Sequence, residues 1–462
     1  MFSAETYKQR RARLKQDIGS GLVLFLGNDE VGRTYAASTY PFRQDSTFLY
    51  FWGVDQPNLA ALIDIDADSD VLVGEEATMA DVVWSGPLPS LAERGAVSGV
   101  TRVIAPAALQ EQLSAAAPSG RTVHYLAPYR SDHTVKIAAW IGVANSAVTP
   151  GRSEAFHKAV IAQRNYKSAE ELAEMERAVG VSKAMYAAAM SAAKPGKFEY
   201  EIVAEIERVA VASGGAFSFL PICSVHGETL HNPHYRNQLK AGDVMVLDSG
   251  AETPNAYASD ITRTLPIGGT FTPQQRLIYE IVLRAEMGAI AAVKPGVAYR
   301  DVHLGAARSI VVDLTAAGLM KGDPDAAVAA GAHALFFPHG LGHMIGLDVH
   351  DMENLGEDFV GYGPGFTRST QFGLAYLRLA RTLEPGFTLT VEPGIYFVPA
   401  LIDQWKADGT NAQFLNFAEI EKFRDARGYR VEDNVVVTDK GYRVIGPAIP
   451  KTVADVEAAC AD

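Results

Sequence analysis

Residues 244–267 read VMVLDSGAETPNAYASDITRTLPI and place two acidic side chains within apolar, β-rich sequence. The first apolar run ends at Asp248, and the second alternates so that Asp260, Thr262 and Thr264 share one face of a strand. The short connection between the runs favours an antiparallel pair. We therefore expect Asp248 and Asp260 to approach each other, although burying isolated charges is costly.

Three further segments of the second half carry the same kind of residue. FTLTVEPGIYF (387–397) has Glu392 in an otherwise apolar strand pattern, and YRVEDNVVVT (429–438) has Glu432. HGLGHMIGLDVHD (339–351) concentrates three of the eleven histidines in thirteen residues, in sequence too rich in glycine for a good helix. These segments predict a site built from carboxylates and imidazole.

Buried carboxylates must be neutralised by protons, basic side chains or cations. Arg263, Arg430 and the histidines could neutralise some of them, whereas a pair of divalent cations would neutralise all four. Taken alone, each acid could instead be a capping or salt-bridged residue, and His339 with His343 could be a surface pair. Their combination favours a dinuclear metal site of the kind that hydrolytic enzymes use.

The composition excludes several classes of protein. The 462 residues include 48% hydrophobic side chains, and 41 basic against 54 acidic residues give a net charge of −13, so we expect no nucleic-acid partner. Two cysteines, Cys223 and Cys460, are too few for a disulfide framework. No apolar run approaches the roughly 20 residues of a membrane span, and the amino terminus lacks a signal-peptide pattern. We expect a cytoplasmic protein without a membrane partner.

The sequence predicts two domains. Residues 1–160 alternate strand and helix patterns, which favours an α/β domain. Strands are expected at 21–28, 48–54, 59–66 and 69–75, with two more flanking a helix between 101 and 128. Residues 161–462 form the second domain, whose first helix is expected to begin at Ser168, because Glu171 completes a capping box.

The second domain contains an internal echo. AAKPGKFEYEIVAEIE (192–207) is similar to AAVKPGVAYRDVHLGAAR (291–308), and each reads as a helix end, a Pro-Gly stop and a new helix. This spacing of about one hundred residues favours two duplicated halves. The alternative is chance similarity between two alanine-rich helix ends.

In their order along the chain, LDSGAE, SDITRT, HGLGHMIGLDVHD, TVEPGIYF and RVEDNVVVT resemble the five metal-site segments of the Xaa-Pro metallopeptidases. TYPFRQDSTFLYFWG (39–53) also resembles the amino-terminal domain of aminopeptidase P. The resemblance implies an α/β amino-terminal domain followed by an α+β catalytic domain of the pita-bread (creatinase/aminopeptidase) fold, with two halves related by a pseudo-twofold axis. It also implies hydrolysis of Xaa-Pro bonds in proline-containing peptides.

The resemblance implies two divalent ions, Mn²⁺ first and Co²⁺ or Zn²⁺ as alternatives, which activate a water molecule. Asp260 and Glu432 would bridge the ions. Asp248 would serve one ion, and His343 with Glu392 the other.

The resemblance also implies catalytic and substrate-binding roles. Glu392 would additionally transfer a proton to the proline nitrogen. Three histidines would lie at the substrate: His231, in ETLHNPHY, His339, beside the ligand histidine, and His350, which would stabilise the tetrahedral intermediate.

Two branches of the family fit the chain. Its first domain resembles that of aminopeptidase P, whereas AHALFFPHGLGHMIGLDVHD and the insertion at 400–423 resemble Xaa-Pro dipeptidases (prolidases). Arg378, fourteen residues before Glu392, matches the prolidase arginine that binds the dipeptide's carboxylate, a task that suits a guanidinium. Arg378 could also be an ordinary surface residue. Arg430 is a second candidate for the carboxylate, or for holding Glu432.

We interpret the chain as an Xaa-Pro dipeptidase, with Xaa-Pro aminopeptidase as the alternative. A non-catalytic pita-bread binding protein is a third hypothesis, which retention of all five ligands opposes. The resemblance also implies a homodimer, in which Trp84, in VVWSG, would reach the partner's active site. A tryptophan packed in the core is the alternative for Trp84.

Overall fold

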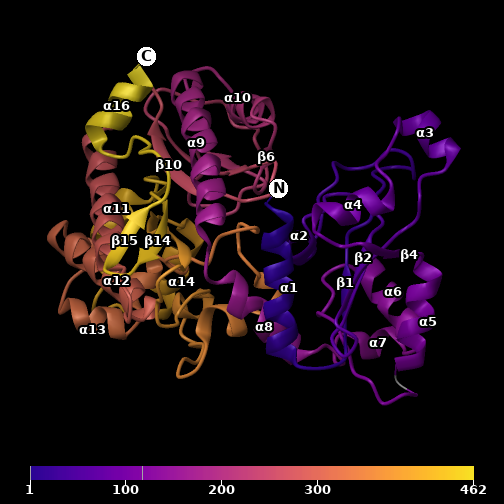
Figure 1. Cartoon of the computed structure of the whole chain (residues 1–462). Helices are drawn as coiled ribbons and strands as arrows, with labels where there is room; N and C mark the ends of the chain where they lie inside the picture. Colours follow the sequence, from indigo (N-terminus) through magenta and orange to yellow (C-terminus); the bar gives the residue numbers. More distant parts are fainter. Residues whose placement is uncertain (1, 117, 462) are drawn as a thin grey trace. The chain divides into compact units, whose positions relative to one another are not determined.

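The computed structural model describes residues 2–116 and 118–461 (Figure 1). By its internal contacts the chain divides into two compact units, one ending at Arg164 and the other beginning at Asn165. Each unit buries its own set of apolar side chains. The domain boundary expected from the sequence, after residue 160, falls within the last helix of the first unit.

The first unit is built on one mixed sheet. Its strands are β1 (Leu22–Leu26), β2 (Ala60–Asp64), β3 (Ser69–Val73), β4 (Arg102–Ile104) and β5 (Val123–His124), in the order β4-β3-β2-β1-β5. The central pairs β1–β2 and β2–β3 are antiparallel, and the outer pairs β1–β5 and β3–β4 are parallel. These strands match five of the six predicted from the sequence.

Helices complete the first unit. Leu109 and Leu113 of α5 and Ile137 of α6 pack on the buried apolar side chains of β1, β2 and β3, which explains the helical spacing of apolar residues in these segments. The helices are α1 (Ala4–Ile18), α2 (Ser46–Trp52), α3 (Met79–Ser85), α4 (Leu91–Val97), α5 (Pro106–Ala116), α6 (Ser131–Ile141), α7 (Asn145–Val148) and α8 (Glu154–Arg164).

The strand predicted at residues 48–54 is wrong, because most of this segment belongs to helix α2. The Asp45 side chain caps the helix by accepting a hydrogen bond from Phe48 N, and Gly53 ends it in the left-handed conformation with φ 62°. A short apolar run fits a buried strand as well as a fully buried helix, and here aromatic side chains such as Phe48 and Trp52 are buried around the helix. The two caps are the signals that decide for the helix.

Trp84 lies on α3, none of whose side chains is buried. Its side chain is 88% exposed, and Met79 and Val83 of the same helix are also exposed. The alternative of a tryptophan in the core is therefore wrong. An exposed apolar group of this kind is typical of contact surfaces.

The second unit contains two similar helix pairs. As predicted, Ser168 caps α9 (Ala169–Ala192) through a capping box with Glu171. α9 packs on α10 (Glu199–Ala212), and α11 (Pro273–Ala292) packs on α12 (Tyr299–Ala316). Each pair is joined by a Lys-Pro-Gly turn whose glycine, Gly196 or Gly296, has a positive φ that favours glycine. The internal echo in the sequence therefore corresponds to a repeated helical hairpin.

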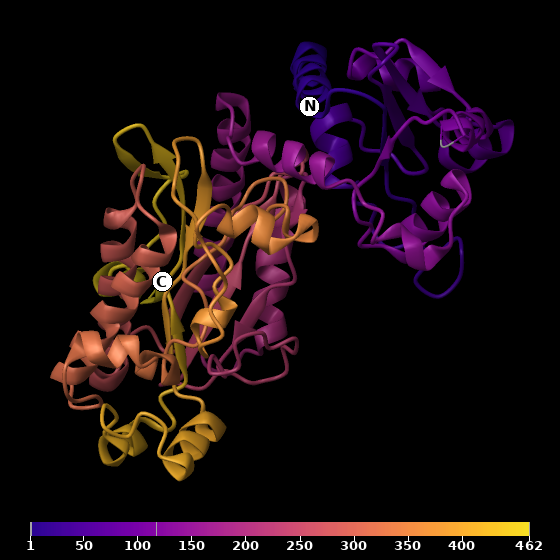
Figure 2. The same cartoon turned by 90° about the horizontal axis from the view of Figure 1, so that it is seen from below.

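The strands of this unit lie between the two helix pairs (Figure 1, Figure 2). β7 (Ile222–Ser224), β8 (Val244–Ser249) and β10 (Ile261–Pro266) form one antiparallel sheet, and β11 (Thr388–Val391), β14 (Asp433–Thr438) and β15 (Gly441–Val444) form another. β12 (Gly394–Tyr396) pairs with β13 (Gly428–Arg430), and β6 (Ala216–Phe217) with β9 (Ala251–Glu252). The predicted antiparallel pairing of the Asp248 and Asp260 segments is confirmed by β8 and β10.

The two halves of the second unit meet at their strands. Thr262 of β10 forms a β-bridge with Glu432, which links the first half to the second at the level of the predicted ligands. The remaining helices and turns are α13 (Pro324–Ala329), α14 (Pro399–Asp408), α15 (Phe417–Ile420), α16 (Val453–Ala461), η1 (Ala332–Leu335), η2 (Glu353–Leu355), η3 (Asp358–Tyr362), η4 (Leu374–Tyr376) and η5 (Glu421–Phe423).

Within the described residues, three helices are long enough to cross a bilayer, α9 with 24 residues, α11 with 20 and α12 with 18. All three carry several charged side chains, among them Glu174 on α9, Arg276 on α11 and Arg308 on α12. Within residues 2–116 and 118–461, no helix combines the length and the apolar character that a membrane span requires.

Candidate metal centre and substrate cavity

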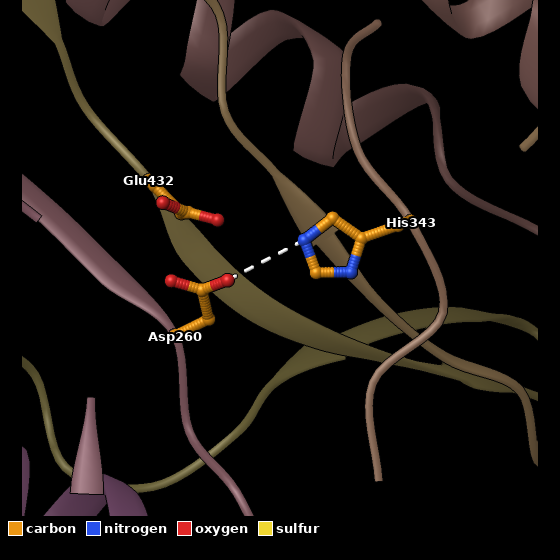
Figure 3. Close-up of side chains that lie close together, drawn as sticks. All are labelled: Asp260, His343 and Glu432. Carbon is orange, nitrogen blue, oxygen red and sulfur yellow. Dashed lines mark ion pairs between the residues drawn. The ribbon is translucent and has the colours of Figure 1, made fainter. Parts of the chain in front are cut away.

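Three of the predicted metal ligands lie together where the two halves of the second unit meet (Figure 3). Asp260 immediately precedes β10, His343 comes from the 339–351 loop, and Glu432 lies between β13 and β14. One ligand atom of each lies within 4.8 Å of the others, and His343 Nε2 is 3.4 Å from Asp260 Oδ2. All three side chains are buried. This grouping can hold a metal ion.

The other two predicted ligands line the same cavity. Asp248 lies on β8 directly opposite Thr262, and Glu392 Oε1 is 3.7 Å from His343 Nε2. Glu392 was expected inside a strand, but it occupies the break between β11 and β12, where Pro393 cannot donate a ladder hydrogen bond. Glu432 lies at a similar break, between β13 and β14.

His343 is held in one orientation by the backbone around it. Its Nδ1 lies 3.0 Å from Met344 O, which can only accept, so Nδ1 carries the proton and the Nε2 lone pair points toward the carboxylates. The preceding Gly342 packs against β11, where a Cβ would come within 2.1 Å of Thr390 O. Thr390 also accepts a hydrogen bond from His343 N. The glycines of this loop therefore let the imidazole approach the acids closely.

The acids of this cluster lack enough basic partners. Burial raises the pKa of Asp260 and of Glu432 well above the usual range, and raises that of Glu392 to about 7. Among the described residues, Asp248 Oδ1, Asp260 Oδ1 and Glu432 Oε1 are buried without a hydrogen-bond partner. Unpaired carboxylate oxygens beside a neutral imidazole nitrogen fit hard or borderline divalent cations. The residues present therefore suit a metal centre.

Arg430 is the one basic side chain bonded directly to these acids within the described structure. Its Nη2 donates to Asp248 Oδ2 at 2.6 Å, its Nη1 to Tyr396 Oη and its Nε to Thr262 Oγ1. Thr262 Oγ1 in turn donates to Glu432 Oε2 at 2.6 Å. The guanidinium is buried, and each of its three nitrogens is used within the protein. It holds Asp248 directly and Glu432 only through Thr262.

A cavity of about 670 Å³ extends from this cluster. Its volume is in the range of small-molecule sites. All candidate site residues of the second unit line it: His231, Asp248, Asp260, His339, His343, His350, Arg378, Glu392, Arg430 and Glu432.

His339 forms part of the cavity wall with both ring nitrogens engaged. Its Nδ1 lies 2.8 Å from Gly340 O, so the proton is on Nδ1, and its Nε2 accepts from Tyr396 Oη at 3.0 Å. Burial lowers its pKa to about 3, which keeps the ring neutral. His339 thus orients Tyr396, which also accepts from Arg430.

His350 and Arg378 are linked by an acid that we did not assign from the sequence. Glu353 lies 2.5 Å from His350 Nδ1 through one oxygen and 2.5 Å from Arg378 Nη1 through the other. The hydrogen bond from His350 lowers the pKa of Glu353 to about 2, so this carboxyl is ionised at neutral pH. Arg378 also donates to Glu357 Oε1 at 2.9 Å. Arg378 therefore lies at the cavity, bound to two acids.

His231 is exposed and lies in the loop that follows β7. Burial of part of its ring, followed by repulsion from Arg430, lowers its pKa, so the ring is neutral at physiological pH. The described residues give its ring no hydrogen bond, whereas the neighbouring Asn232 donates to Ser224 Oγ at 2.9 Å. The loop is therefore fixed beside His231, and the ring remains available to a ligand.

Three residues of the site were missed in the sequence. Tyr396 lies in the FTLTVEPGIYF segment, four residues after Glu392, and Glu353 lies three residues after His350. Glu357 is the second residue of the glycine-rich segment at 356–370. The two acids lie three and seven residues after His350. This spacing, together with the expectation that Arg378 needs an acidic partner, is the signal that could have found them.

Models of known families match both units. The model described as metallopeptidase family M24 matches residues 173–439, and the model described as the aminopeptidase P, N-terminal domain matches residues 7–124. The first match covers more than half of the chain and contains all five predicted ligands.

Similar sequences have been assigned activities. The Xaa-Pro dipeptidase of Homo sapiens is 33% identical over 98% of this chain and 91% of its own length. The Xaa-Pro dipeptidase of Rattus norvegicus is 34% identical over 96% of this chain and 89% of its own length. A probable Xaa-Pro aminopeptidase of Botryotinia fuckeliana is 33% identical over 87% of this chain and 84% of its own length.

Solved structures of the same fold cover the whole chain. Proline aminopeptidase P II from Yersinia pestis has a TM-score of 0.81 at 27% identity, with 100% of both chains covered. Zinc-substituted aminopeptidase P of Escherichia coli, in complex with product, has a TM-score of 0.80 at 28% identity, covering 100% of this chain and 98% of that one. The predicted fold class, an α/β domain followed by a pita-bread domain, is thereby confirmed. The chain belongs to metallopeptidase family M24 and is an Xaa-Pro metallopeptidase that uses divalent metal.

Proposed function

We propose that this Xaa-Pro metallopeptidase is a dipeptidase with two divalent cations, Mn²⁺ first. Asp260 and Glu432 would bridge the cations, Asp248 would hold one, and His343 with Glu392 the other. The three unpartnered buried oxygens, on Asp248, Asp260 and Glu432, support this assignment. Two divalent cations supply a water molecule of lowered pKa and a polarised substrate carbonyl.

Glu392 is proposed to move the proton. Its carboxylate lies beside His343 at the cavity. A carboxylate in this place can accept a proton from water at one of its oxygens and give it to the proline nitrogen. The backbone that carries this side chain lies at the break between β11 and β12.

The histidines are proposed to orient the substrate. Glu353 accepts a hydrogen bond from His350 Nδ1, and a protonated His350 would donate from Nε2 to the substrate carbonyl oxygen. His231 offers an uncommitted ring from the opposite sequence half. His339 acts through Tyr396, since both of its own nitrogens are engaged. We assign Arg430 to holding Asp248, because its guanidinium is buried and each of its three nitrogens already donates to a group of the protein.

The position of Arg378 is the structural observation that favours a dipeptidase. Its guanidinium lies at the cavity and is 33% exposed, and its two protein partners both bind Nη1. In the described part of the chain, Nε and Nη2 form no hydrogen bond, so one edge of the planar group can bind a carboxylate with two hydrogen bonds. A dipeptide presents its free prolyl carboxylate one residue beyond the bond to be cleaved. The identity to mammalian Xaa-Pro dipeptidases supports the same choice.

Xaa-Pro aminopeptidase is the second candidate, favoured by the aminopeptidase P structures that match the whole chain. The two activities are separated by comparing the Mn²⁺-loaded enzyme on an Xaa-Pro dipeptide and on the same peptide extended by two residues. We expect kcat/KM to favour the dipeptide, and Arg378→Ala to remove that preference by raising KM for the dipeptide. Preference for the extended peptide would identify an aminopeptidase. Failure to cleave either peptide with metal bound would favour a binding protein.

We also propose a homodimer in which Trp84 closes the partner's substrate cavity. The exposed apolar side chains of α3 support a contact surface there. Light scattering of the full chain should give twice the monomer mass. Trp84→Ala should raise KM, and an unchanged KM and kcat in a dimeric variant would refute the role of Trp84.

A further inference from the structure

The two acids on Arg378 form a chain of charges that ends in the glycine-rich segment 356–370. Glu353 joins His350 to Arg378, and Glu357 joins Arg378 to Arg368, with 2.6 Å between Glu357 Oε2 and Arg368 Nη2. Each acid uses one oxygen for Arg378 and the other for its second partner. Nη1 of Arg378 is therefore bound by two acids, each of which is fixed by a second partner.

Arg368 fixes the far end of this chain. Its guanidinium lies over the Tyr362 ring, 4.7 Å from the centroid, and its Nη1 donates to Ala375 O and Leu377 O. Tyr362 Oη donates to Leu377 O at 2.7 Å. The backbone just before Arg378 is thus tied to the same segment that supplies Glu357. The 356–370 segment therefore positions both the Arg378 side chain, through Glu357, and the backbone just before Arg378.

The contacts determine which edge of Arg378 remains available. Both acids contact Nη1, so a second ligand cannot bind across Nη1 and Nη2 without displacing a carboxylate. The edge formed by Nε and Nη2 has no hydrogen bond within the described residues. A carboxylate binds such an edge with two parallel hydrogen bonds. A lone arginine would instead sample many rotamers and lose that preorganisation.

We propose that Glu353 and Glu357 are positioning residues that hold the Nη1 corner of Arg378 and present its Nε–Nη2 edge to the carboxylate of a bound dipeptide. This inference rests on the proposed function, because it assigns a substrate carboxylate to Arg378. Glu357 also ties the recognition of that carboxylate to the 356–370 segment. The acids do not touch the reacting bond, so they set substrate affinity and selectivity.

The test compares Glu357→Gln with Asp358→Asn in the full-length Mn²⁺-loaded chain. Asp358 binds the same Arg368 but is exposed and makes no contact with Arg378, which makes it a matched control. Each variant is assayed on an Xaa-Pro dipeptide and on its carboxamide, which lacks the free carboxylate. For Glu357→Gln we expect KM for the dipeptide to rise about tenfold, with kcat and the carboxamide KM within about twofold of wild type. Asp358→Asn should leave both substrates unchanged.

Further variants distinguish a failure of the positioning role from a failure of the proposed function. Combining Glu357→Gln with Arg378→Ala should add no further rise in KM, because the glutamate acts through the arginine. Glu353→Gln should raise the dipeptide KM and also lower kcat on both substrates, since it releases His350 as well. The inference is overturned if Arg378→Ala removes dipeptide preference but Glu357→Gln behaves like Asp358→Asn, or if it impairs both substrates equally. If Arg378→Ala itself leaves the preference intact, the proposed function fails and the inference with it.

Discussion

Two clusters of buried acids lie side by side in the second unit, and adjacent residues belong to different clusters. Glu432 faces Asp260, Glu392 and Asp248 in the metal-ligand cluster, which has only Arg430 as a bonded basic partner within the described structure. Asp433 faces away from it and accepts from Arg263 Nη2 at 2.8 Å and Lys451 Nζ at 2.6 Å.

The Asp433 cluster is balanced. Lys451 also bonds Glu286 at 2.8 Å, so two acids meet two bases in a buried setting. Although burial opposes it, attraction from Arg263 and Lys451 holds the pKa of Asp433 below its usual range, whereas burial raises the pKa of Glu286 to about 8. In the metal-ligand cluster burial raises the pKa of both Asp260 and Glu432, and neither carboxylate is bonded by an arginine or lysine among the described residues. Buried acids therefore indicate a metal site only where the protein supplies too few bases for them.

The largest effect is expected from Asp260→Asn, which removes a ligand shared by both cations. We expect kcat/KM to fall at least about a thousandfold, because a ligand matters more than the residues that orient it. The thermal midpoint of the metal-free variant should equal or exceed that of metal-free wild type, since burial disfavours ionisation of Asp260 and an asparagine does not ionise. Activity within tenfold of wild type would contradict the ligand role of Asp260.

The same change from aspartate to asparagine in the Asp433 cluster should lower stability and leave metal binding nearly unchanged. Asp433→Asn leaves Arg263 and Lys451 without their shared acid and should cost about 3 kcal/mol in the free energy of unfolding, measured with urea. The metal affinity of the folded variant should change little, because the side chain of Asp433 binds these bases and not the ligands. A variant as stable as wild type would show that the balance of charges is unimportant.

A smaller effect is expected from Thr262→Val. Its hydroxyl donates to Glu432 Oε2 and accepts from Arg430 Nε, so it orients one ligand and connects the site to its basic residue. Losing such a bond should weaken Mn²⁺ binding by roughly 10–100-fold, measured by calorimetry. Thr264→Val provides a control on the same strand face, because Thr264 bonds the backbone of Arg430 and no ligand. Equal losses in both variants would indicate a general packing effect.

The smallest effect concerns pH. In the folded metal-free chain, burial raises the pKa of Glu392 from its ordinary value of 4.5 to about 7. Between these two pH values Glu392 keeps its proton in the folded chain, whereas the unfolded chain has released it. Because the folded state binds more protons in this window, the free energy of unfolding should fall as pH rises through it. The free energy of unfolding of the metal-free chain can be measured with urea at about pH 5 and pH 8. Its decrease between the two pH values should be smaller for Glu392→Gln than for wild type. An equal loss would mean that Glu392 is ionised throughout.

The sequence predicted the metal-ligand cluster because its members repeat a visible conflict, an acid inside apolar sequence. The β8–β10 pair followed from alternation and a short connection. The balanced cluster was not predicted, because Glu286 and Lys451 are 165 positions apart and neither residue conflicts with its own segment. Tertiary pairing of this kind leaves no local pattern.

Helix α2 shows where local patterns are insufficient. Its aromatic run is too short for a period to be measured, and Gly53, which ends the helix, was included in the predicted strand at 48–54. Arg378 was predicted at the substrate site, but the acids that hold it were not, because Glu353 and Glu357 reach it from a different segment. Partners of a site residue depend on loop geometry that the sequence does not display.

The central claim is that the unbalanced acids hold two divalent cations. Calorimetric titration of the metal-free chain with Mn²⁺, beside Asp260→Asn, tests it most directly. The account predicts two ions per wild-type chain, with binding to the variant greatly weakened because both ions lose a shared ligand. Wild type that binds no more Mn²⁺ than the variant would contradict it.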